Sequence, residues 1–80
     1  MIYSPSGVCS KEIHFELDEN GKIHNTCFIG GCNGNLKGIS ALVEGMDAKE
    51  AISRLEGIRC GAKATSCPDQ LAHALKAALK

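Results

Sequence analysis

The chain has 80 residues, and its nine basic and nine acidic side chains cancel, so its formal net charge is zero. A chain of this length forms one domain, spanning residues 1–80, whose small core supplies little stability by itself; such domains often gain stability from a metal or a partner. With one tyrosine, two phenylalanines and no basic stripe, the composition argues against a nucleic-acid-binding surface.

The N-terminal residues lack the basic segment and apolar run of a signal peptide, and no segment is long enough to span a membrane. We therefore expect a soluble cytoplasmic protein without a membrane partner. In that compartment its five cysteines are expected to be metal ligands or reactive thiols rather than disulfides, and the odd count leaves at least one unpaired. The oligomeric state is left open.

The N-terminal part of the chain predicts a β-hairpin. Ser4–Gly7 is typical of a turn, residues 12–17 alternate between polar and apolar, and Asn20-Gly21 favours a tight turn. The second strand is expected over residues 22–29, with Ile23, Cys27 and Ile29 on its apolar face. We thus expect Cys27 to be buried, so that Cys27→Ser would mainly reduce stability.

The glycine-rich stretch from Phe28 to Met46 joins this hairpin to the first helix. A helix is predicted from Asn35 to Glu44, ended by Gly45 in a left-handed conformation. Cys32 stands where the strand gives way to the helix, and free helical amides there favour the thiolate form of a cysteine. Cys32 is therefore a candidate reactive or metal-binding residue.

Two further helices are predicted. Asp47 is the expected N-cap of the second, and Ser66 that of the third, with Pro68 in its first turn and Cys67 on its apolar face. Strands followed by helices predict an α+β fold, a small antiparallel sheet with three helices packed on one face. The expected core consists of Ile13, Phe15, Leu17, Ile23, Leu36, Ile39, Leu42, Ile52, Leu55, Leu71 and Leu75.

The cysteines show no Cys-x-x-Cys spacing, so any metal site would have to be assembled from separate loops. A hairpin returns the chain to its starting end, which would bring Cys9 and Cys32 together, and Cys67 would join them if the last helix begins there. Cys60 is the candidate fourth ligand. Four thiolates suit either zinc or an iron–sulfur cluster, whereas His14, His24 and His73 have no second ligand at a metal-binding offset.

Three motifs carry a resemblance to a known family. The segment Thr65-Ser66-Cys67-Pro68-Asp69, YSPSGVCSKEI near the start and GGCNGNLKGI in the middle together resemble the TSCPD-domain family over the whole chain. The same domain is found at the C-terminus of adenosylcobalamin-dependent ribonucleotide reductases. The resemblance therefore implies a stand-alone accessory to ribonucleotide reduction and DNA synthesis, with a reductase as protein partner. Eighty residues cannot build the catalytic barrel and radical cofactor pocket of a complete reductase.

A weaker resemblance is to the U-type iron–sulfur cluster scaffold proteins. It rests on Pro-x-x-x-Cys at the N-terminus, a Gly-Cys pair opening a helix, and a cysteine followed nine residues later by Lys-Ala-Ala. The ligands it implies are Cys9, Cys32 and Cys67. The scaffold family has an aspartate where this chain has Lys11, and a histidine where it has Ser66.

Two alternatives to a metal-thiolate domain stay open, so whether the protein is an enzyme is also open. In the first, Cys32 and Cys67 cycle between dithiol and disulfide and pass electrons to a reductase. In the second, a regulatory domain binds the phosphates of a nucleotide at the glycine turn. That anion site would consist of Gly30, Gly31, Asn33 and Gly34.

Overall fold

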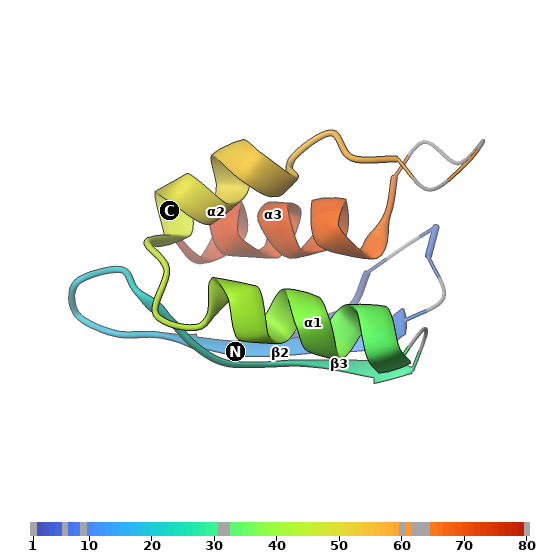
Figure 1. Cartoon of the computed structure of the whole chain (residues 1–80). Coiled ribbons are helices and arrows are strands. Elements are labelled where there is room, and N and C mark those ends of the chain that lie inside the picture. The colour runs from blue at the N-terminus through green and yellow to red at the C-terminus, as the bar shows by residue number, and fades with distance from the viewer. Residues whose placement is uncertain are drawn as a thin grey trace.

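The computed structural model describes residues 2–5, 7–8, 10–30, 33–59, 61 and 65–79. Within them the chain forms strands and then helices, which confirms the predicted α+β class. The elements are β1 (Ile2–Tyr3), β2 (Ser10–Leu17), β3 (Ile23–Gly30), α1 (Asn33–Val43), α2 (Ala48–Leu55) and α3 (Cys67–Ala78) (Figure 1). No helix in the described part of the chain is long and apolar enough to cross a membrane.

The antiparallel sheet has the strand order β1-β2-β3, and its central feature is the predicted β2–β3 hairpin. Asp18 fixes the turn, because its carboxylate accepts the backbone N–H groups of Asn20 and Lys22, each at 2.9 Å. Gly21 has φ of +76°, so the left-handed conformation of the turn falls on a residue without a Cβ atom. The Asn-Gly signal therefore located the hairpin correctly.

β1 extends the sheet beyond β2, although the sequence predicts only a turn ahead of the first long strand. Ile2 pairs with His14, and Tyr3 pairs with Ile13. A strand of two residues is too short to show the alternation of apolar and polar side chains that identifies strands in a sequence. Its existence depends on the neighbouring β2 strand.

A β-bulge at Asn25 reverses the predicted faces of the second half of β3. Asn25 has φ of +56°, and the hairpin register shifts by one residue between the pairs made by His14 and Glu16. Such an extra residue moves the following side chains to the opposite face of the strand. The prediction that Cys27 is buried is therefore wrong: Cys27 is exposed, and Phe28 packs against the core instead.

His24 is held between two carboxylates at the turn end of the sheet. Its Nε2 lies 2.8 Å from Asp18 Oδ2, and its Nδ1 lies 2.8 Å from Glu44 Oε2. Because a neutral imidazole carries only one ring N–H, the ring must be protonated on both nitrogens to donate to both carboxylates. These hydrogen bonds, that to Asp18 foremost, raise the pKa of His24 above its ordinary 6.5. Glu44 follows α1, so His24 ties this helix to the hairpin.

We expect the free energy of unfolding to decrease as the pH rises through the raised pKa of His24. A folded-state pKa above the unfolded one gives a contribution that is fully present below about pH 6.5 and is lost as the pH passes the folded-state value. The pKa of Asp18 and that of Glu44 are lowered, mainly by His24 and by the Asn25 N–H respectively. Their contributions are present at neutral pH and are lost only as the pH falls through those lowered values.

The measurement is urea unfolding from about pH 5 to about pH 9, alongside NMR titration of the His24 ring. The matched variant His24→Gln should lose this decrease, because glutamine does not titrate. A wild type and a His24→Gln variant with the same pH profile would contradict the expectation.

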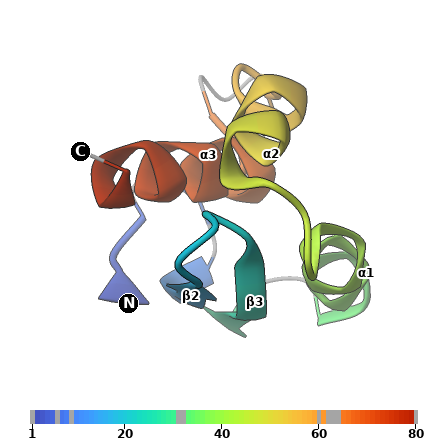
Figure 2. The ribbon, with the colours of Figure 1, turned by 90° about the vertical axis from the view of Figure 1, so that its left-hand side faces the viewer.

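The three helices take different positions around the sheet (Figure 2). α3 lies over one face of the sheet, α2 packs on α3, and α1 runs beside β3. Their ends follow the predicted signals: Gly45 has φ of +77° after α1, Asp47 caps α2 by accepting the Lys49 N–H at 2.9 Å, and Ser66 caps α3. No helix of the described residues covers the other face of the sheet in this view.

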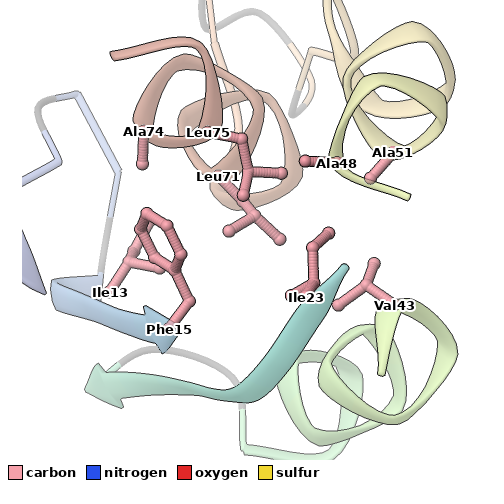
Figure 3. Packing of buried hydrophobic residues seen from close by; sticks show 9 residues of the cluster. All are labelled: Ile13, Phe15, Ile23, Val43, Ala48, Ala51, Leu71, Ala74 and Leu75. Atoms are coloured by element: carbon pink, nitrogen blue, oxygen red, sulfur yellow. The ribbon is translucent and has the colours of Figure 1, made fainter. Parts of the chain in front are cut away.

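The core fills the space between the hairpin and the helices, and its side chains point toward one another in Figure 3. Leu36 is buried as predicted, but Leu42 is 75% exposed, so its predicted core position is wrong. Val43 faces the core instead, because it follows Leu36 by two helical turns, whereas Leu42 points to another side of α1. The buried cluster comprises Ile13, Phe15, Ile23, Val43, Ala48, Ala51, Leu71, Ala74 and Leu75, and Leu17, Ile39, Ile52 and Leu55 pack against it.

Candidate functional site

Cys67 opens α3, directly after the N-cap. Ser66 Oγ accepts the Asp69 N–H at 3.2 Å, which starts the helix at the cysteine. The Cys67 residue is only 9% exposed, and its Sγ lies 3.2 Å from the hydroxyl oxygen of Ser10, which is 3% exposed. The sulfur is thus in a buried polar contact between the beginning of α3 and the beginning of β2.

Ser10 connects this helix N-terminus to the open end of the hairpin. It is the first residue of β2, and it pairs with Gly30, the last residue of β3. Ser10 directly follows the predicted ligand Cys9, and Gly30 precedes the predicted ligand Cys32 by two residues. The first of these residues contacts Cys67 and the second pairs with the first. The remaining predicted ligands, Cys9, Cys32 and Cys60, lie outside the described residues, so the convergence of the four cysteines stays a prediction.

The glycine turn is described only in part. Gly30 ends β3 with φ of +84°, and Asn33 and the exposed Gly34 begin α1. Gly31 lies outside the described residues. The predicted anion or nucleotide site at these four residues accordingly stays a prediction.

The described histidines contact carboxylates. Nε2 of His14 lies 2.8 Å from Glu12 Oε1, and Nε2 of His73 lies 3.2 Å from Asp69 Oδ2, in addition to the two contacts of His24. Within the described ranges, no three side chains of His, Cys, Asp or Glu are arranged to hold a metal ion.

Asp69 accepts hydrogen bonds that connect the α2–α3 loop to the N-terminus of α3. Its side chain is buried, and Oδ1 accepts the Gly57 N–H at 2.7 Å while Oδ2 accepts the Thr65 hydroxyl. The Thr65 hydroxyl foremost, and then the Gly57 N–H, hold the pKa of Asp69 below its ordinary value. Ser66 Oγ donates to the Ile58 carbonyl at 2.6 Å, which adds a further tie to the same loop.

The Thr65–Asp69 segment therefore contains Cys67 and also holds the α2–α3 loop against α3 by hydrogen bonds. Thr65, Ser66 and Asp69 fasten the end of the α2–α3 connection to the first turn of α3. These hydrogen bonds fix where α3 begins, and hence where the Cys67 side chain is presented. We call these three residues and their contacts to Gly57 and Ile58 the Asp69 clamp.

Sequence reasoning missed two parts of this site. It assigned Asp69 only to the first turn of the helix, because the N-cap spacing shows the local role of an acidic residue and not its distant partners. It also missed Ser10, whose inward direction is hidden by a register shift between Ser10 and Glu12. A buried polar residue at a strand end can be identified only when the register is known.

Comparison with known proteins identifies the family of the chain. A family model described as the TSCPD domain matches residues 1–79. No curated protein and no solved structure matches the chain. The match therefore covers the whole described fold, including the Asp69 clamp and Cys67.

Proposed function

Because this chain belongs to the TSCPD-domain family, which is associated with ribonucleotide reductases, we propose that it is a metal-thiolate domain that assists ribonucleotide reduction in the cytoplasm. Its ligands would be Cys9, Cys32, Cys60 and Cys67. Four soft sulfur donors suit zinc or an iron–sulfur cluster. The bound metal would add folding free energy by linking three parts of the chain, in a domain whose own core is small.

The contact between Ser10 Oγ and Cys67 Sγ is the observation that supports this proposal most. A thiolate that binds a metal commonly accepts a hydrogen bond from a group behind it, and the buried Ser10 hydroxyl is placed to donate one. Ser10 is also the covalent neighbour of Cys9. Cys67 is thus buried beside Ser10, the residue that directly follows the proposed ligand Cys9.

The test is metal analysis of protein purified anaerobically without chelator. We expect about one zinc ion or one cluster per chain in the wild type and in Cys27→Ser, because Cys27 lies on the far side of the sheet from Cys67. Cys67→Ser and Cys32→Ser should each lose most of the metal. Circular dichroism would confirm that the variants remain folded.

Two outcomes would overturn the proposal. One is a folded wild type without metal under anaerobic conditions. If that protein carried a disulfide between Cys32 and Cys67, the thiol-redox alternative would replace the metal site. The other is a folded Cys67→Ser variant with wild-type metal content, since the proposal makes the buried Cys67 thiolate one of the four ligands.

A further inference from the structure

The face of the sheet turned away from α3 carries a second cluster of reactive side chains. Glu12 and His14 alternate with core residues along β2 and so share this outer face, as the exposure pattern of the strand shows. The bulge at Asn25 brings Cys27 of β3 to the same face. Without the bulge, Cys27 would face the core.

His14 and Cys27 are direct partners across the antiparallel pair of β2 and β3. Residues so paired have Cβ atoms roughly 4.5–5.5 Å apart, which places the imidazole within reach of the thiol through ordinary side-chain rotation. Cys27 is exposed and free of any disulfide. His14 and Cys27 are thus cross-strand neighbours on an accessible surface.

Glu12 determines which nitrogen of His14 is available. Its Oε1 lies 2.8 Å from His14 Nε2, and because an ionised carboxylate can only accept, the proton of the neutral ring lies on Nε2. Nδ1 is then the basic nitrogen. Many unrelated enzymes activate a cysteine nucleophile by this arrangement, in which a base lies beside the thiol and a carboxylate orients the base.

A shallow hollow adjoins His14 on the side of β1. It has a volume of about 390 Å³ and is lined by Ile2, His14, Phe15, Glu16 and Asn25. Cys27 lines a separate hollow of about 160 Å³, beside Leu36, Lys37 and Ser40 of α1, and a small molecule can reach the thiol from that side.

From these contacts we propose that Cys27 is a thiol–disulfide exchange site for low-molecular-weight disulfides, with His14 as its base and Glu12 as a positioning residue. The proton of Cys27 moves to His14 Nδ1, and the sulfur attacks one sulfur of the disulfide. The new bond joins Cys27 to that sulfur as the old S–S bond breaks, and the leaving thiolate takes the proton from His14. The products are one mixed disulfide and one free thiol, and no other electron donor or acceptor is needed.

This site is independent of the proposed metal site. Ser10 and Cys67 lie on the α3 side of the sheet, whereas His14 and Cys27 lie on the other. Exchange at Cys27 would attach a group to the uncovered face without disturbing the core. Loss of the metal in a Cys67→Ser variant should accordingly leave exchange at Cys27 unchanged.

The experiment follows the reaction of the intact protein with glutathione disulfide at neutral pH, with peptide mass mapping to count only adducts on Cys27. We expect His14→Gln to slow adduct formation about tenfold, less than a fully positioned base contributes, because this pair lies on an open surface. Cys27→Ser supplies the background and should form no adduct in this peptide. Equal rates in the wild type and in His14→Gln would overturn the role of His14, and no adduct on wild-type Cys27 would overturn the site.

The role of Glu12 has its own measurement. Nitrogen-15 chemical shifts of the His14 ring distinguish the tautomer protonated on Nε2 from that protonated on Nδ1. We expect Glu12→Ala to reduce the Nε2 tautomer and to slow exchange at Cys27, while Glu12→Asp restores part of both. An unchanged tautomer in Glu12→Ala would contradict the positioning role.

Discussion

Replacing Asp69 by alanine is expected to lower the free energy of unfolding by about 3 kcal/mol, since hydrogen bonds to a charged group contribute about 1.5–3 kcal/mol and unpaired buried partners add a penalty. The variant would leave the Gly57 N–H and the Thr65 hydroxyl without their acceptor. It would also remove the contact from His73. Urea unfolding at neutral pH measures the loss.

The matched control is Asp47→Ala, which makes the same change at the start of α2. Asp47 is exposed and its carboxylate accepts the Lys49 N–H, so its replacement should cost about 1 kcal/mol, as for an ordinary N-cap. The loss of unfolding free energy in Asp69→Ala beyond that in Asp47→Ala measures the contribution of the Asp69 clamp. If Asp69→Ala costs no more than Asp47→Ala, the clamp does not stabilise the fold.

The pH dependence gives an independent check of the same residue. The pKa of Asp69 in the folded protein is lowered, so its contribution to stability is fully present above the ordinary value of 3.8 and disappears as the pH falls through the lower folded-state value. The difference in stability between the wild type and Asp69→Ala should therefore narrow in acid. A constant difference down to the lowest pH at which the protein folds would contradict the ionised role of Asp69.

Replacing Leu71 by alanine is expected to lower the free energy of unfolding by about 2–5 kcal/mol, the range for a leucine in a packed core. Leu71 is fully buried among residues of β2, β3 and α3, as Figure 3 shows. Its loss would remove apolar contacts and leave a cavity between the hairpin and the helix. Since small domains have a total stability of about 5–15 kcal/mol, this one substitution could unfold a large fraction of the protein.

Leu42→Ala is the control that separates burial from residue type. Leu42 lies on a helix like Leu71 but is exposed, and alanine is the better helix former, so its replacement should change stability by less than about 0.5 kcal/mol. Thermal unfolding of the two variants would be compared. Equal losses of stability in the two variants would contradict the exposure of the Leu42 side chain to solvent.

The sequence by itself determined the elements whose signals are local. The hairpin turn follows from Asn20-Gly21, the start of α3 from Ser66 and Pro68, and the end of α1 from Gly45. Each signal depends on backbone angles or hydrogen bonds within a few residues, which the local chain decides. The TSCPD family was likewise identified from its motifs, and the family comparison confirms it.

Only the tertiary structure decided which way several side chains face. Asn25 adds one residue to β3, and this single shift exposes Cys27 beside His14 and turns Phe28 inward. The alternation of apolar residues cannot show such a bulge, because it is fixed by the pairing of two strands rather than by either strand alone.

The partners of Cys67 and Asp69 were decided in the same way. Ser10 is far from Cys67 in sequence, and Gly57 is separated from Asp69 by the whole α2–α3 connection, yet both pairs are in hydrogen-bond contact. Local patterns locate the start of a helix but not what is packed against it, because docking is determined by the burial of side chains from distant segments. The chemistry available to Cys67 therefore depends on where α3 meets the open end of the hairpin.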